Sequence, residues 1–204
     1  MQQKTQLFIF PHAGGSDLSY LAMEKSLSSG FDVCTICYPG RGRRYTDVFV
    51  RNMDELVKDS LSILLSKHKG GDFFIMGHSF GALVAFECMK KLQLQQRKLP
   101  NLAILSGKQA PSYRSTETPK HTLDDVLLVN FLKNIGGLPQ ELAENPSFLS
   151  FYLPIIRNDL ALNETYEYKN VMPLNVPLVL INGTEDKDIK PSAIEAWQQE
   201  TSQK

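Results

Sequence analysis

Ser79 is the residue of this chain best suited to covalent chemistry, because it sits in the pentapeptide Gly-His-Ser-Phe-Gly at 77–81. An apolar run precedes the pentapeptide, and an apolar stretch of helical character follows it. This context predicts a sharp strand–turn–helix junction, the nucleophile elbow. Side chains at Gly77 and Gly81 would collide with backbone in so tight a turn. The Ser79 hydroxyl would then stand at a helix N-terminus, where N–H groups favour a developing negative charge. The alternative is a glycine-serine turn without chemistry.

A serine hydroxyl needs a base to remove its proton, and an acidic residue to orient that base. When the elbow is built on an α/β sheet, the acid follows a late strand and the histidine comes after the acid. The segment 177–186, Pro-Leu-Val-Leu-Ile-Asn-Gly-Thr-Glu-Asp, reads as a strand, a glycine turn and two carboxylates. Glu185, Asp186 and Asp188 are therefore the candidates, and we favour Asp186.

Two backbone N–H groups are expected to stabilise the oxyanion of a tetrahedral intermediate. One belongs to the residue after the nucleophile, here Phe80, and the other to a loop after an early strand. The segment Pro-His-Ala-Gly-Gly at 11–15 is that loop, and its glycines allow the backbone to turn inward. We expect Ala13 to supply the second N–H, with Gly14 as the alternative.

Apolar runs alternate with helical periods along most of the chain, which predicts an α/β fold with a mostly parallel sheet flanked by helices. The expected strands are 7–10, 31–38, 73–76, 102–105 and 177–181. The expected helices of this core begin near Ser16 and run over 53–68, 80–96 and 191–197. Asn52 and Glu55 form a capping box at the start of the second helix.

Residues 110–170 interrupt this alternation, because helical patterns follow one another there without a strand. The patterns cover 123–135, 139–144 and 145–160. We interpret them as a helical lid over the carboxyl ends of the strands, where open α/β sheets bind their ligands. The core would then consist of 1–109 and 171–204. The alternative is a helical excursion that packs elsewhere.

Charge balance, the length of the apolar runs and the number of cysteines exclude several classes of function. The 22 basic and 22 acidic residues balance, so nothing indicates nucleic acid or an anionic membrane as a partner. The apolar run at 7–10 is too short for a signal peptide or a membrane span, which predicts a cytoplasmic protein. Three cysteines argue against a disulfide framework. Cys34 and Cys37 are better read as core residues than as a metal or redox pair, and we expect neither metal nor cofactor.

Six segments, in order, carry a resemblance to a known family that spans nearly the whole chain. They are Phe-Pro-His-Ala-Gly-Gly at 10–15, Tyr-Pro-Gly-Arg-Gly-Arg at 38–43, Gly-His-Ser-Phe-Gly at 77–81, Gly-Gly-Leu-Pro at 136–139, Leu-Pro-Ile-Ile-Arg-Asn-Asp at 153–159 and the segment 177–186. Together they resemble a type II thioesterase of polyketide and nonribosomal peptide synthesis, an α/β-hydrolase. The resemblance implies hydrolysis of acyl thioesters from the phosphopantetheine arm of acyl or peptidyl carrier proteins, which clears mis-primed or stalled carriers. The resemblance also places Asp186 at the catalytic acid. We expect the protein to be a monomer.

The histidines depart from this family. The family carries its catalytic histidine in a Gly-Gly-His motif after one more strand, whereas all four histidines here precede Asp186. We read His12, His68, His78 and His121 as structural or solvated. The expectation is therefore a chain without the last strand and helix of the fold, in which the catalytic histidine lies beyond residue 204 and turnover is poor.

Three other functions compete with the carrier-editing hydrolase. The chain could be a catalytically impaired module that binds carrier proteins, a medium-chain fatty-acyl thioesterase, or a general carboxylester hydrolase. Thioester and oxyester substrates, compared with carrier binding, distinguish these functions.

Overall fold

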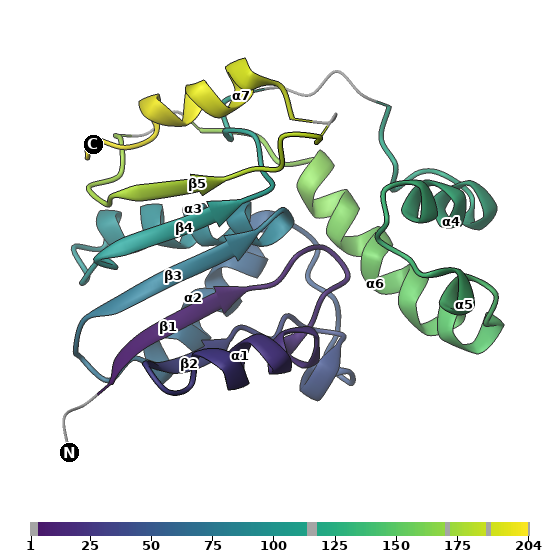
Figure 1. The fold of residues 1–204 in the computed structure, drawn as a ribbon, viewed down its shortest axis with the longest axis horizontal. Coiled ribbons are helices and arrows are strands. Elements are labelled where there is room, and N and C mark those ends of the chain that lie inside the picture. The colour runs from purple at the N-terminus through teal and green to yellow at the C-terminus, as the bar shows by residue number, and fades with distance from the viewer. Residues whose placement is uncertain (1–3, 114–117, 170–171, 187–188, 204) are drawn as a thin grey trace.

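Five parallel strands form one sheet in the order β2-β1-β3-β4-β5 (Figure 1). The structure is a computed structural model that describes residues 4–113, 118–169, 172–186 and 189–203. The strands are β1 Thr5–Phe10, β2 Phe31–Thr35, β3 Phe73–His78, β4 Leu102–Ser106 and β5 Leu178–Ile181. All point the same way, so the loops that follow β1, β3, β4 and β5 meet at one edge of the sheet. The predicted α/β fold is confirmed.

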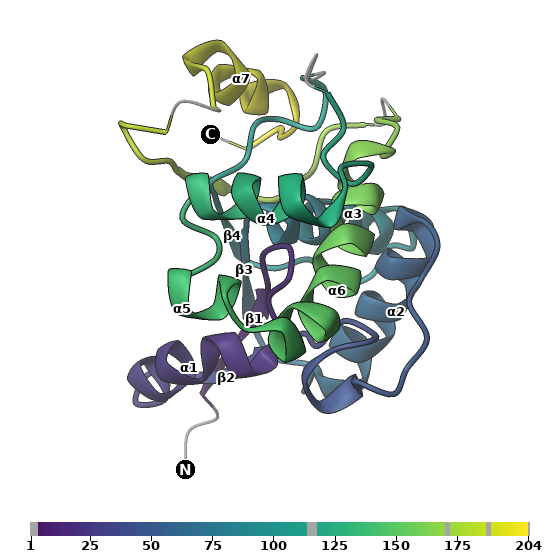
Figure 2. The same cartoon turned by 90° about the vertical axis from the view of Figure 1, so that its right-hand side faces the viewer.

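Two long helices cover one face of the sheet and a short one covers part of the other (Figure 2). Helices α2 (Met53–Lys67) and α3 (Phe80–Leu94) pack on the first face, where the main hydrophobic core lies. Helix α1 (Leu21–Leu27) lies over β1 and β2, above a smaller apolar cluster. Near the C-terminus, α7 (Pro191–Glu195) leads into a 3₁₀ turn, 196–199, that buries Trp197.

The segment between β4 and β5 forms three helices outside the sheet. They are α4 (Asp125–Asn134), α5 (Gln140–Ala143) and α6 (Pro146–Glu164). Figure 1 shows them beside the carboxyl ends of the strands. They have an apolar cluster of their own, built on Leu128, Leu132, Leu138, Leu153 and Ile156. Within the described residues, no helix is long and apolar enough to cross a membrane.

The strand predicted at 31–38 is shorter than expected, because β2 ends at Thr35. The next residues remain buried: the Ile36 N–H still donates to the Ile9 carbonyl oxygen at 2.8 Å, and the Tyr38 hydroxyl donates to the Pro11 carbonyl oxygen over 3.2 Å. Pro39 then prevents further pairing because it has no N–H. The residues after β2 therefore hold the end of β2 against the end of β1 through side-chain and backbone contacts.

The start of the first helix also differs from the prediction. Ser16 is an N-cap, but it opens a 3₁₀ turn, Asp17–Tyr20, before α1 begins. Only half of the predicted capping box of α2 is present: the Asn52 side chain accepts the Glu55 N–H at 2.9 Å. The Glu55 carboxylate accepts the Arg51 N–H at 2.8 Å, so the reciprocal bond goes to the residue before the cap.

Candidate active site

Ser79 occupies the junction between β3 and α3 with a backbone conformation that is rare for serine, φ 52° and ψ −118°. Its N–H donates to the Ser106 carbonyl oxygen at the end of β4, over 2.8 Å. Its side chain is half-buried and does not cap the helix. The predicted strand–turn–helix junction is confirmed, and the Ser79 hydroxyl is left at the N-terminus of a 15-residue helix.

Both glycines of the pentapeptide are required by close backbone approach. A Cβ at Gly77 would lie 2.6 Å from the Gly81 carbonyl oxygen. A Cβ at Gly81 would overlap the carbonyl oxygens of Phe10 and Pro11. The second contact is informative, because those two oxygens belong to the last residue of β1 and the first residue of the loop that follows it. Gly81 thus lets the first turn of α3 lie directly against the predicted oxyanion loop.

The oxyanion loop, residues 11–15, turns tightly next to this helix. The Gly15 N–H donates to the His12 carbonyl oxygen at 2.9 Å, and Gly14 has φ 77°, which favours glycine. The Gly14 N–H donates to Asp159 Oδ2 of α6 at 2.8 Å. Because this N–H is used, Ala13 remains the better of the two predicted donors. Phe80, the first residue of α3, has an N–H with no partner inside the helix.

Asp186 lies in the turn after β5, where its N–H donates to the Gly183 carbonyl oxygen at 3.2 Å. The end of β5 is joined to β4 because the Gly107 N–H donates to the Ile181 carbonyl oxygen at 2.9 Å. Asp186 and Glu185 are both exposed, and the third candidate, Asp188, lies outside the described residues. The turn therefore starts from the same sheet edge as Ser79.

Each of the four histidines has a polar contact with a residue other than Ser79. His12 Nδ1 lies 3.0 Å from the Tyr20 hydroxyl, and His78 Nδ1 lies 2.8 Å from Ser106 Oγ. His68 contacts a backbone carbonyl oxygen, and His121 pairs with Glu164 at 2.5 Å. Burial, followed by the neighbouring His78, lowers the pKa of His12. These contacts agree with the interpretation of all four histidines as structural or solvated residues.

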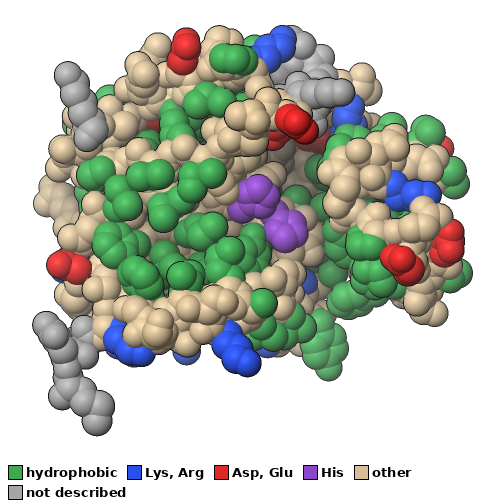
Figure 3. Space-filling view, viewed as in Figure 1, with side chains coloured by type: hydrophobic (Ala, Val, Ile, Leu, Met, Phe, Trp, Pro, Cys, Tyr) green, Lys and Arg blue, Asp and Glu red, His purple; other side chains and the backbone are tan. Residues whose placement is uncertain are grey.

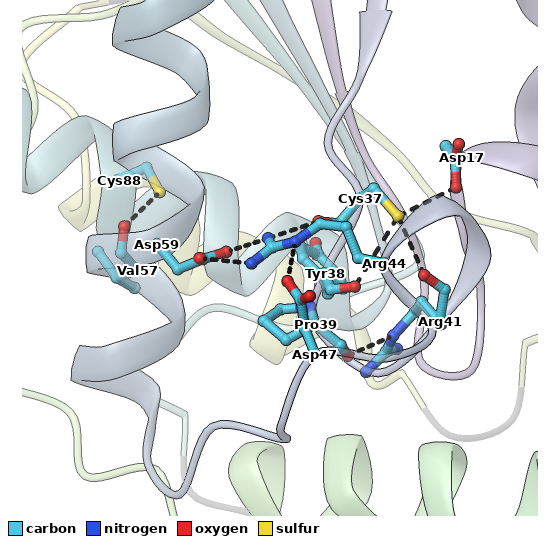
Figure 4. A network of polar contacts seen from close by, with 10 residues as sticks. All are labelled: Asp17, Cys37, Tyr38, Pro39, Arg41, Arg44, Asp47, Val57, Asp59 and Cys88. Carbon is cyan, nitrogen blue, oxygen red and sulfur yellow. Dashed lines mark hydrogen bonds and ion pairs between the residues drawn. The ribbon is translucent and has the colours of Figure 1, made fainter.

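Cysteines that suggested redox or metal chemistry lie in the core. Cys37 is buried and its thiol donates to Asp17 Oδ1 at 3.0 Å (Figure 4). Burial raises the pKa of Cys34 and Cys37 and that of the fully buried Cys88. Raised pKa values disfavour the reactive thiolate.

A cavity of about 460 Å³ does not belong to this site. Its lining residues include Gln93, Arg97 and Pro173, so it lies near the C-terminal end of α3, whereas Ser79 is at the N-terminal end. Around Ser79 the described residues instead bring together the elbow, the oxyanion loop and α6. Sequence reasoning missed the participation of Asp159 and Arg41, although both lie in segments that carried the resemblance.

Comparison with known proteins agrees with this geometry. Residues 5–204 match the family described as Thioesterase domain. Linear gramicidin dehydrogenase LgrE of Brevibacillus parabrevis is 33% identical over 199 residues, which are 96% of this chain and 75% of that protein. The crystal structure of ClbQ from the colibactin NRPS/PKS pathway superposes with a TM-score of 0.92 at 28% identity, covering 99% of this chain and 85% of that one. YbtT, a type II thioesterase from the yersiniabactin NRPS/PKS pathway, gives a TM-score of 0.87 at 29% identity, covering 98% of this chain and 82% of that one.

Proposed function

The chain belongs to the thioesterase domain family and is a thioester hydrolase of the α/β-hydrolase fold, and from this premise we propose an editing function. Its substrates would be acyl thioesters on the phosphopantetheine arm of acyl or peptidyl carrier proteins. The support is the pathway named for its relatives: ClbQ and YbtT both come from NRPS/PKS assembly. We further propose a cytoplasmic monomer, without cofactor or metal, whose macromolecular partners are carrier proteins.

The observation that carries the proposal is the Ser79 junction packed against the oxyanion loop through Gly81. In the proposed reaction, Ser79 Oγ attacks the thioester carbonyl carbon and forms a tetrahedral intermediate. The Ala13 and Phe80 N–H groups stabilise its oxyanion. Collapse of the intermediate expels the phosphopantetheine thiol and leaves an acyl-serine ester. Water then hydrolyses this ester, releases the acid and restores Ser79.

Proton transfer requires a base, and Asp186 is proposed to orient it. The base is proposed to be a histidine outside residues 1–204, because the four histidines of this chain contact Tyr20, Gly71, Ser106 and Glu164 instead. With such a histidine, the protons lost by Ser79 and later by water would pass through one imidazole. Without it, the residual rate would come from binding and oxyanion stabilisation, on the order of 10³–10⁴ over the uncatalysed reaction.

Intact-mass analysis of acyl-loaded carrier protein tests the proposed function. Incubation with the chain should remove the acyl group and leave the phosphopantetheine arm in place. Ser79→Ala should lower this rate, by on the order of 10⁶ when the base is present. Ser26→Ala is the matched control, since Ser26 is exposed on α1.

Other outcomes identify the competing functions. Tight carrier binding by both the parent and Ser79→Ala, with no unloading by either, would replace the hydrolase with a carrier-binding module. Preference for free medium-chain thioesters over loaded carriers would assign fatty-acyl release. Faster hydrolysis of oxyesters than of thioesters would contradict the proposal.

A further inference from the structure

Asp159 is an unusual residue for the middle of a helix, because its carboxylate is completely buried. It accepts three hydrogen bonds. Arg41 approaches with both terminal guanidinium nitrogens: Nη2 lies 2.7 Å from Oδ1, and Nη1 contacts Oδ2. The third donor is the Gly14 N–H, 2.8 Å from Oδ2. One carboxylate therefore joins the helical insertion, the turn after β2 and the oxyanion loop.

A second residue of α6, Tyr152, also packs against the oxyanion loop. A Cβ at Gly14 would lie 2.5 Å from the Tyr152 hydroxyl oxygen, so α6 packs directly on this residue. The Tyr38 hydroxyl donates to the Pro11 carbonyl oxygen at the start of the loop. Both the N–H and the Cα of Gly14 thus face α6, which orients the peptide groups on either side of it.

Arg41 lies in the turn after β2, which is held by several hydrogen bonds and ion pairs (Figure 4). Its side chain is 3% exposed, its Nε donates to the Pro39 carbonyl oxygen, and its guanidinium lies 5.4 Å from the Tyr38 ring centre. Arg44 of the same turn pairs with Asp59 of α2 at 2.6 Å and with Asp47 at 2.7 Å. The Asp159 carboxylate therefore meets a guanidinium that is already in position.

A buried ion pair is weak evidence for stability, because removing two charges from water offsets most of their attraction. Its bidentate geometry does fix orientation, since two parallel N–H···O bonds allow little rotation of the carboxylate. We propose that the Arg41–Asp159 pair positions the oxyanion loop, so that the Ala13 N–H is presented to the substrate carbonyl. This inference rests on the proposed function, in which Ala13 is an oxyanion donor.

The arrangement couples the helical insertion to the chemistry. Asp159 and Tyr152 both belong to α6, so movement of this helix away from the sheet would release Gly14 and with it the neighbouring donor. Asp159 and Arg41 act as positioning residues, because they contact the loop rather than the reacting atoms. Their loss should therefore slow the reaction of Ser79 without reducing affinity for the acyl chain.

The test is the rate at which a fluorophosphonate labels Ser79 in the 204-residue chain, since its phosphoryl oxygen occupies the oxyanion site. Asp159→Asn retains the shape and one acceptor but loses the charge. We expect its second-order labelling rate to fall by about 10–100-fold, less than the 10²–10³ typical for loss of a whole donor. Asp125→Asn is the matched control, because Asp125 is an exposed acid of α4 that pairs with Arg157.

Amide hydrogen exchange of Gly14 gives a second readout that a general loss of stability would not produce. In Asp159→Asn the Gly14 N–H should exchange faster while the amides of β3 keep their protection. If this variant does not fold, Arg41→Lys decides by the same two measurements, because it keeps the charge but not the bidentate contact. Parental labelling rates in the folded variant would overturn the inference. Undiminished labelling of Ser79→Ala would instead overturn the proposed function.

Discussion

Ser79 has a positive φ of 52°, a conformation that costs on the order of 1–3 kcal/mol for a residue with a side chain. The surrounding contacts hold it there. Its N–H is bonded to Ser106, and Gly77 and Gly81 allow β3, α3 and the oxyanion loop to approach within contact distance. Such a strained conformation persists only where the surrounding structure enforces it. Here the conformation keeps the Ser79 hydroxyl above the end of the sheet.

Gly81→Ala tests this close approach at the residue scale. The added methyl group would overlap the backbone oxygens of Phe10 and Pro11, so the loop and α3 must separate. We expect a loss of about 1–3 kcal/mol in the free energy of unfolding, as for overpacked sites, together with slower Ser79 labelling. Gly71→Ala is the control, since a Cβ there meets nothing within 4 Å. Urea unfolding and labelling rates measure both effects, and equal behaviour of the two variants would contradict this account.

Asp186 is tested against the neighbouring carboxylate in any form of the enzyme that turns over. Asp186→Asn should lower acyl-thioester turnover by about 10⁴, as expected when the residue that orients the base is neutralised. Glu185→Gln should stay near the parental rate, because Glu185 is exposed in the same turn without a proposed role. If Glu185→Gln is the more damaging change, the acid has been assigned to the wrong residue.

At the scale of elements, α6 connects the insertion to the rest of the molecule. Its Asp159 contacts the oxyanion loop, and the side-chain oxygen of its Asn163 accepts a hydrogen bond from the Lys108 ammonium at 2.8 Å. Its Arg157 donates hydrogen bonds to the His121 and Leu123 carbonyl oxygens. These contacts fix α6 on the sheet edge and attach the segment before α4 to it. The insertion therefore has the position expected of a lid, which we retain as a proposal.

Leu132 and Val126 separate packing from substrate contact in this insertion. Leu132 is 3% exposed within the apolar cluster, so Leu132→Ala should lower the free energy of unfolding by about 2–5 kcal/mol. Val126 is 71% exposed on α4, so Val126→Ala should be nearly neutral in urea unfolding. Val126→Ala should instead shift acyl-chain preference while labelling of Ser79 by a small probe is unchanged. Parallel loss of labelling would mean that the exposed apolar side chains only support the fold.

The sequence was informative where local rules determine the structure. The elbow, the Asn52 cap and the three helices of the insertion follow from glycine sterics, capping and apolar periodicity, and all are present. The end of β2 was misplaced because Tyr38 is apolar enough to continue a strand, while its hydroxyl bonds to Pro11. The Arg41–Asp159 pair spans 118 positions, and neither residue carries a local signal for the other. Long-range pairing of this kind depends on the completed fold.

At the scale of the molecule, the face of the sheet opposite α2 and α3 carries many partly exposed apolar side chains. Figure 3 shows apolar side chains spread across this face, over the strands that α1 does not cover. They alternate with buried residues of β3 and β4 and with the half-buried Leu178 and Leu180 of β5. The set is Phe74, Met76, Leu102, Ile104, Val179 and Ile181. Strand β5 is also the edge of the described sheet. A broad apolar face beside an edge strand favours non-specific aggregation at high concentration, whereas the functional unit proposed above is a monomer.

Ile181→Lys should therefore reduce self-association. Ile181 is 53% exposed on the edge strand, and a lysine there would charge the face with little change in packing. Val48→Lys is the control, because Val48 is 86% exposed in a loop before α2. Sedimentation velocity over a concentration series should show less association for Ile181→Lys alone. Equal association of parent, Ile181→Lys and Val48→Lys would mean that this face does not drive it.

The central claim, that Ser79 is the nucleophile, is tested most directly by peptide mapping after prolonged reaction with a fluorophosphonate. The account predicts one modified peptide, containing residues 77–81, with the adduct on the Ser79 hydroxyl and none in Ser79→Ala. Labelling should be slow in the 204-residue chain, because its four histidines contact other groups. An adduct on another serine, or unchanged modification of the Ser79→Ala chain, would contradict the account.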